Sequence, residues 1–138
     1  MSTVIRPKIS EKNKYWIEKH RYYELKHFCL QYPLWKKELA AISFIAGSNH
    51  QKTSDKHRHD VDPVSEIASK REVLIRKVSI VDEAMNEADA KLGTYILFGI
   101  LNGVSYDVIR AKFDIPCGKE KYYDLYRRFF WILDKLRK

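Results

Sequence analysis

Residues 103–138 read GVSYDVIRAKFDIPCGKEKYYDLYRRFFWILDKLRK, and this stretch has the order of a helix, a tight turn and a second helix. Ser105 is a favourable N-cap residue and predicts a short helix over residues 106–113. Arg110 and Lys112 are expected to stay in water on this helix. Three of its apolar side chains are expected to face inward: Val108, Ile109 and Phe113.

The turn is expected at residues 114–118. Ile115 supplies an apolar anchor, Pro116 cannot continue a helical ladder, and Gly118 permits a backbone conformation closed to other residues. The second helix should therefore begin at about Lys119. Its apolar residues share one sector at about 100° per residue; they are Tyr122, Leu125, Tyr126, Phe129, Ile132, Leu133 and Leu136.

A helix with an apolar back and a front of Lys, Arg and Tyr fits the major groove of DNA, where its leading residues reach base edges. Arg127 and Arg128 would then hold phosphates, although adjacent charges are also common on an ordinary solvated face. The predicted DNA-binding residues come from both helices: Arg110, Lys112, Lys119, Lys121, Tyr123, Asp124, Arg127 and Arg128.

The run from Gly103 to Ile109, followed by Phe113-Asp114-Ile115 and then Gly118, resembles the helix-turn-helix of sigma-factor region 4. The resemblance implies that residues 106–113 support the motif and that the helix from Lys119 to Arg137 reads DNA. Where that motif commonly has a small hydroxyl residue and then an apolar one, this chain has Lys119 and Glu120. The reading helix is therefore expected to start or rotate differently.

Two wider stretches, RYYELKHFCLQYPLWKKEL (residues 21–39) and DIPCGKEKYYDLYRRFFWILDK (residues 114–135), resemble small phage and prophage proteins near the RinA and ArpU late-gene regulators. Together they cover about a third of the chain. The resemblance implies a transcriptional regulator from a phage or an integrated element, working in the cytoplasm of a bacterial host cell.

The N-terminal part, residues 1–45, predicts a loose basic arm over about 1–11, followed by aromatic helices. Pro33 interrupts the helical pattern, so a kink or a break into two helices is expected there. One apolar face should continue through either outcome. It comprises Tyr22, Leu25, Phe28, Tyr32, Trp35, Leu39 and Ile42.

Residues 46–62 contain no aromatic residue and a single Val, which predicts a flexible linker or loop. Pro63 then opens a long helix with heptad-spaced apolar residues, ending near Asp89 or Ala90. That helix suits a bundle or a dimer seam equally. Residues 92–101 are uniformly apolar and should be buried. We expect residues 63–138 to form one compact unit with residues 12–45.

Composition narrows the classes of function. The chain has 138 residues and a formal net charge of +8, and the positive charge lies in residues 1–61 and 105–138. An excess of Lys and Arg is compatible with a polyanionic partner. The two cysteines, Cys29 and Cys117, predict free thiols in a reducing compartment. No stretch is apolar enough to predict a transmembrane span, so we expect no membrane association.

We expect no enzyme activity, because no phosphate loop, nucleophile elbow or HExxH motif occurs. We also expect no cofactor. His50, His57 and His59 lie beside Asp residues, but their spacing favours a solvated loop over a metal site.

The sequence thus predicts an all-α helical bundle with a C-terminal helix-turn-helix that binds double-stranded DNA, with RNA polymerase and a second copy as further partners. One alternative is a protein-interaction module that uses the aromatic faces around Trp35 and Trp131. Another is a DNA-packaging adaptor of the small-terminase kind.

Limited proteolysis tests the expected linker. Trypsin should cut first between Gly47 and Asp60, at Lys52, Lys56 or Arg58, because this segment has no apolar anchors. Fragments separated by gel electrophoresis and sized by mass spectrometry would locate the cut. Early cleavage within residues 64–101 would contradict the predicted organisation.

Overall fold

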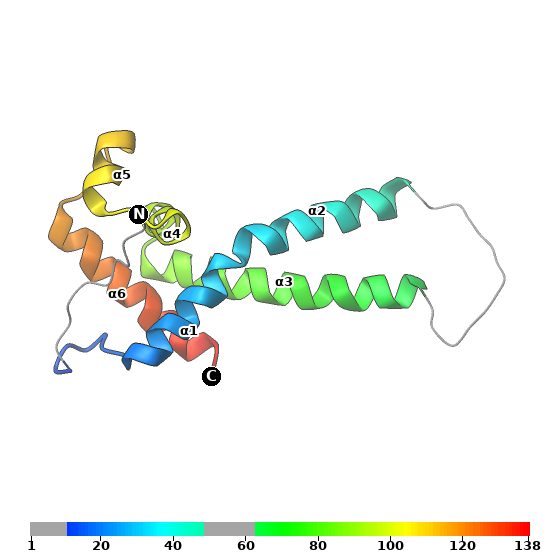
Figure 1. Ribbon diagram of the computed structural model, residues 1–138, viewed down its shortest axis with the longest axis horizontal. Helices are drawn as coiled ribbons and strands as arrows, with labels where there is room; N and C mark the ends of the chain where they lie inside the picture. Colours follow the sequence, from blue (N-terminus) through cyan, green and yellow to red (C-terminus); the bar gives the residue numbers. More distant parts are fainter. Residues whose placement is uncertain (1–10, 49–62) are drawn as a thin grey trace. The chain divides into compact units, whose positions relative to one another are not determined.

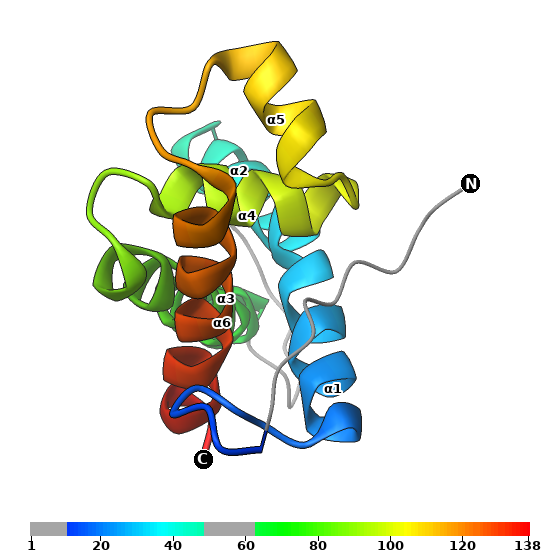
Figure 2. The same ribbon diagram turned by 90° about the vertical axis from the view of Figure 1, so that its left-hand side faces the viewer.

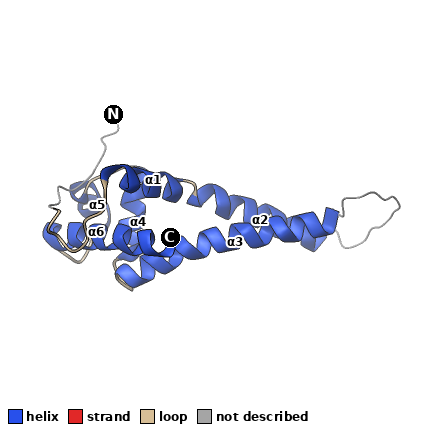
Figure 3. Cartoon of the chain, turned by 90° about the horizontal axis from the view of Figure 1, so that it is seen from below, coloured by secondary structure: helices blue, strands red, loops and turns tan. Residues whose placement is uncertain are grey.

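The computed structural model describes residues 11–48 and 63–138, and these ranges contain helices and connecting loops without strands (Figures 1 and 3). The helices are α1 (Lys19–Leu30), α2 (Tyr32–Ser48), α3 (Pro63–Ala88), α4 (Gly93–Asn102), α5 (Tyr106–Phe113) and α6 (Lys119–Leu136). The predicted all-α bundle is confirmed. The expected basic arm lies almost wholly outside the described residues, as does most of the expected linker; α2 extends to Ser48, past the predicted linker start at residue 46.

The chain divides into two compact units. Unit 1 comprises Met1–Leu30 and Ile80–Lys138, and unit 2 comprises Gln31–Ser79. The boundary falls inside α3, between Ser79 and Ile80. The heptad pattern of α3 continues across the boundary, and periodicity alone does not show where a helix changes partners.

In unit 1, α6 contacts α1, α4 and α5, as Figure 2 shows. Its aromatic back forms much of the core. The ring centroids of Tyr22 and Phe130 lie 4.8 Å apart, and those of Tyr126 and Phe130 lie 5.3 Å apart. The Tyr22 and Tyr126 hydroxyls form a hydrogen bond of 3.0 Å, so two buried polar groups satisfy one another. Phe130 is buried as well, outside the predicted apolar sector.

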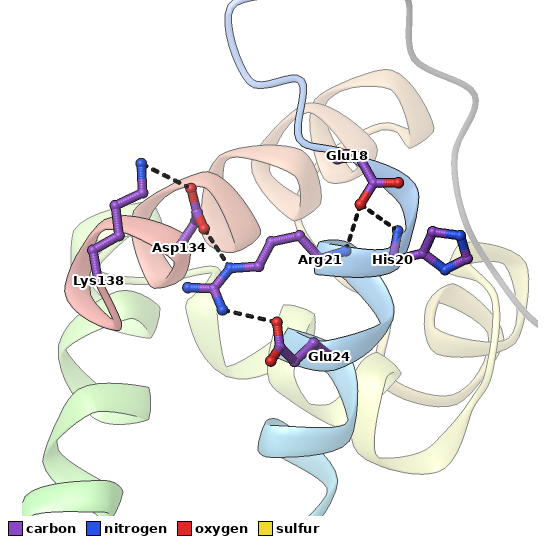
Figure 4. Close-up of polar contacts among 6 residues, drawn as sticks. All are labelled: Glu18, His20, Arg21, Glu24, Asp134 and Lys138. Carbon is purple, nitrogen blue, oxygen red and sulfur yellow. Dashed lines mark hydrogen bonds and ion pairs between the residues drawn. The ribbon is translucent and has the colours of Figure 1, made fainter.

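A polar link joins α1 to the C-terminal end of α6 (Figure 4). Arg21 Nε donates to Asp134 Oδ1 at 2.6 Å, and Arg21 Nη1 donates to Glu24 at 2.9 Å. These hydrogen bonds raise the pKa of Arg21, the bond to Asp134 most of all. Glu18 Oε1 accepts the backbone N–H groups of His20 and Arg21 and so caps the start of α1.

The predicted interruption at Pro33 is a break between two helices. Helix α1 ends at Leu30 and α2 begins at Tyr32, with the Trp35 N–H donating to the Gln31 carbonyl at 3.0 Å. Pro33 therefore sits in the first turn of α2, where its missing N–H costs no hydrogen bond. The expected apolar face is largely buried, with Tyr32 and Leu39 half-buried.

Helix α4 is buried on most sides, as predicted, and two glycines allow close contacts. A Cβ at Gly93 would lie 2.3 Å from the Met85 backbone oxygen, and a Cβ at Gly99 would lie 2.3 Å from the Tyr122 hydroxyl. The helix ends at Gly103, whose φ of 61° and N–H bond to the Gly99 carbonyl form a left-handed C-cap.

The prediction that Val108 and Phe113 of α5 face inward is wrong. Val108 is 46% exposed and Phe113 is 43% exposed, whereas Ile109 is fully buried. A helix of two turns buries a narrow sector, which Tyr106 and Ile109 occupy. Phe113 lies at the margin of this sector, with its ring centroid 4.9 Å from that of Phe98.

The turn at residues 114–118 is present, but the residue with a left-handed backbone is not the Gly118 expected from the sequence. Gly118 has an extended backbone with φ of −83°, whereas Asp114 adopts the left-handed conformation with φ of 54° and closes α5. Ile115 is buried, as predicted. The Tyr106 hydroxyl donates to the Cys117 carbonyl, so the turn is also held from α5.

Matched glycine substitutions test the approach of α3 to α4. Gly93→Ala should lower the free energy of unfolding by about 1–3 kcal/mol, because its Cβ would clash with the Met85 backbone oxygen. Gly118→Ala is the control: it meets nothing within 4 Å and should change stability by less than about 0.5 kcal/mol. Urea denaturation would measure both, and equal midpoints for the two variants would contradict the close packing at Gly93.

Candidate nucleic-acid interface

The N-terminal half of α6 presents one face to solvent and buries the other. Tyr122 and Tyr126 are buried, while Lys121 and Asp124 are exposed. An open hollow on this face is lined by Lys119, Glu120, Lys121, Tyr123, Asp124, Arg127 and the edge of the buried Leu125. The predicted reading helix therefore begins at the expected residue and has a solvent-facing front.

The start of α6 favours anions. Gly118 is the N-cap and contributes no side-chain hydrogen bond, and the Tyr122 N–H donates to the Gly118 carbonyl at 3.0 Å. The N–H groups of the first turn have no partner within a helix, and they carry the positive end of the helix dipole. A phosphate is a suitable ligand for such a helix end.

One side of α6 is held against α5. The Tyr123 hydroxyl accepts the backbone N–H of Tyr106 at 3.1 Å, so it caps the start of α5 where the Ser105 side chain makes no cap bond. Lys119 Nζ lies 3.6 Å from Asp107 Oδ2, and both side chains are largely exposed. Such an exposed pair adds little to stability and leaves Lys119 able to exchange partners. Tyr123 thus has a structural role that the sequence did not indicate.

The other side of α6 is held against the end of α3. Arg128 donates to the Glu87 carbonyl through Nε at 3.3 Å and through Nη2 at 3.1 Å. Its Nη1 lies 3.3 Å from the Tyr15 hydroxyl. Glu87 lies in the last turn of α3, where carbonyls lack helical partners and favour a cation. The guanidinium of Arg128 therefore serves the fold, which sequence reasoning missed because the partners are distant in the chain.

The two predicted cations of α5 do not act together. Arg110 and Lys112 are both exposed, but they lie two positions apart and so point about 200° apart around the helix. Arg110 follows Asp107, the ion-pair partner of Lys119, by one turn and shares its face of α5. Lys112 shares a face with Val108 instead. The structure therefore groups Arg110 with the start of α6 and leaves Lys112 outside that group.

Acidic residues lie among these cations. Residues 119–124 read KEKYYD, with two lysines and two acids. Glu120 and Asp124 are exposed one turn apart on the front of α6. A face of mixed sign attracts phosphates only weakly and adds groups that accept hydrogen bonds. This arrangement suits a selective site more than broad binding to polyanions.

The two tryptophans of the alternative interaction model are engaged within the fold. The Trp131 ring lies 5.5 Å from the Tyr15 ring, and Lys135 Nζ lies 4.2 Å from the Trp131 centroid. Trp35 is buried, with Lys77 Nζ 5.6 Å from its ring. Trp35 is therefore covered within the fold, whereas the Trp131 ring is half-buried.

Both cysteines are free thiols, and burial affects the pKa of each. Burial raises the pKa of the Cys29 thiol to about 12, and it raises the pKa of the half-buried Cys117 thiol as well. Within residues 11–48 and 63–138, no three His, Cys, Asp or Glu side chains gather as metal ligands would. The three histidines near residue 55 lie outside these ranges.

Comparisons with protein-family models, with curated proteins and with solved structures find no match for this chain. Among the described helices, none combines the length and the apolar character needed to cross a membrane. A proposal about function therefore rests on the residues and geometry above.

Stability measurements can distinguish residues that hold α6 in place from exposed residues of the same face. Arg128→Gln and Tyr123→Phe should each lower the free energy of unfolding by about 0.5–1.5 kcal/mol, because each loses a hydrogen bond between helices. Lys121→Gln is the control and should stay within about 0.5 kcal/mol of the parent. An unchanged urea midpoint for Arg128→Gln would return that guanidinium to the set of candidate phosphate contacts.

Proposed function

We propose that this protein is a transcriptional regulator of phage or prophage type that binds double-stranded DNA, with the first two turns of α6 in the major groove. The observation that carries the proposal is the exposed start of α6, where Lys119 and Lys121 project beside uncapped N–H groups while the back of the helix is buried. A helix held in this way keeps its reading residues in place.

The positions of these side chains support two types of proposed DNA contact. Lys121 and Asp124 lie on the outward front and reach base edges, where an acid accepts a hydrogen bond from cytosine N4. Lys119 and Arg110 lie at the α5 side and hold phosphates. Arg127 is half-buried and lines the same hollow. Tyr123 and Arg128 act indirectly, by fixing the rotation of α6.

A protein-interaction module is the second candidate, and unit 2 is the observation that favours it. Residues 63–73 of α3 are exposed along their whole length. Val64 is 75% exposed and Phe44 of α2 is 74% exposed. Exposed apolar side chains of this kind favour a docking surface, so a protein partner, a second copy or RNA polymerase would stabilise this segment. A DNA-packaging adaptor would combine such assembly with DNA binding.

Binding measurements on the preferred site, obtained by genome-wide capture of DNA with the tagged protein, test the proposal. Lys121→Gln should cost about 1–3 kcal/mol, mainly on the preferred sequence. Arg110→Gln should weaken binding to most duplexes and lower the slope of log K against log salt by about 0.9. Leu125→Ala is a folding control and should lose about 2–5 kcal/mol of stability.

Lys19→Gln is the control for charge, because Lys19 begins α1, which is linked through Arg21 to the far end of α6. It should bind like the parent. If folded Lys121→Gln and Arg110→Gln also bind like the parent, α6 does not read DNA and the interaction module becomes the leading function.

A further inference from the structure

We propose that Lys91, in the turn between α3 and α4, is a further phosphate contact of the same DNA interface, and that Asp89 in that turn weakens the contact. The inference rests on the proposed function. It adds a second element of the chain to a surface so far assigned to α5 and α6.

The position of the turn follows from Arg128. Lys121 and Arg128 lie seven residues apart on α6, which places them on the same face about two turns apart. Arg128 is bonded to the Glu87 carbonyl, at the end of α3. The chain that follows Glu87 connects to α4, which also contacts α6, and Figure 2 shows this connection beside the N-terminal half of α6. The turn that carries Lys91 therefore lies on the Lys121 side of α6.

The turn is held in one conformation by Asp89. Its Oδ1 accepts the backbone N–H groups of Lys91 and Leu92, both at 2.8 Å. The Asp89 N–H donates to the Met85 carbonyl at 3.3 Å, and the Gly93 N–H donates to the Asp89 carbonyl at 3.0 Å. Two of these hydrogen bonds lie within the turn, and the other two tie it to α3 and to α4. The Lys91 residue is exposed, so its ammonium is accessible on a turn whose backbone is hydrogen-bonded.

Electrostatics supports the same placement. The hydrogen bond from Leu92 and that from Lys91 are the main causes that lower the pKa of Asp89, and the charges of Lys121 and Lys91 lower it further. Both ammonium groups therefore act on one carboxylate. Asp89 remains ionised at neutral pH and opposes a phosphate that approaches either lysine.

The strength of the proposed phosphate contact therefore depends on both Lys91 and Asp89. Lys91 and Lys121 come from different elements, so together they can hold the backbone on one side of the groove that α6 enters. The Asp89 charge offsets part of this attraction while its oxygen keeps the turn in place. Removing the charge and keeping the oxygen should therefore strengthen binding while the turn retains an acceptor for its two N–H groups.

Three charge-removing variants of the full-length chain test this inference on the captured DNA site. Lys91→Gln should weaken binding about threefold to tenfold and lower the salt slope by about 0.9, as loss of one phosphate contact does. Asp89→Asn keeps the Oδ1 acceptor and should tighten binding by a similar factor, with a small fall in the thermal midpoint because the carboxylate charge strengthens the two bonds that it accepts. Lys19→Gln makes the same charge change near the opposite end of α6 and should bind like the parent.

The outcomes separate this inference from the proposed function. If Lys121→Gln weakens binding while Lys91→Gln and Asp89→Asn stay within twofold of the parent, the turn is not a contact and α6 alone carries the interface. If the parent itself binds no duplex from the captured set, the proposed function fails and this inference fails with it. Opposite shifts for Lys91→Gln and Asp89→Asn, with Lys19→Gln unchanged, would establish the contact.

Discussion

Burial of the aromatic back of α6 is the constraint on which unit 1 depends. Tyr122, Phe129 and Phe130 are almost fully buried, and the hydroxyl pair of Tyr22 and Tyr126 satisfies two polar groups in the same layer. Large aromatic side chains supply much of the apolar burial in a small core. Because these rings fix the rotation of α6 about its own axis, they also decide which of its charged residues reach solvent. The packing of the core therefore determines which residues of α6 form the candidate interface.

Local signals predicted the helices of the C-terminal part well. The starts of α5 and α6 lie at the expected residues, since Ser105, Pro116 and Gly118 interrupt helical backbone in ways that act within a few residues. Within the turn, the prediction failed at one φ angle: Gly118 is the permissive residue, yet Asp114 closes α5 in the left-handed conformation. Asp tolerates that conformation better than most residues, so composition alone did not decide between the two.

The roles of individual site residues were harder to predict, for a physical reason. Helical periodicity predicted that Tyr123 and Arg128 face solvent, because it considers α6 without the helices that pack against it. Their partners, the Tyr106 N–H and the Glu87 carbonyl, lie 17 and 41 residues away in the chain. Exposed backbone groups at helix ends attract such side chains whichever helix supplies them. The same limit explains the division inside α3, whose apolar spacing continues unchanged from exposed residues 63–73 into the buried core.

The anchoring of α6 on both sides has a consequence for the charge of its front. Once Arg128 is bound to α3 and Lys119 lies beside Asp107, the cations nearest the helix start are few, and Glu120, Asp124 and Asp89 stand among them. Non-specific attraction to DNA grows with the number of phosphates neutralised, so this front gains little from charge alone. Hydrogen bonds to particular bases would then have to provide most of the affinity. The acidic side chains would repel the phosphate backbone of every duplex equally, so a duplex that lacks those bases would bind weakly. A mixed-sign front on a rigidly held helix is therefore better suited to choosing among duplexes than to binding all of them.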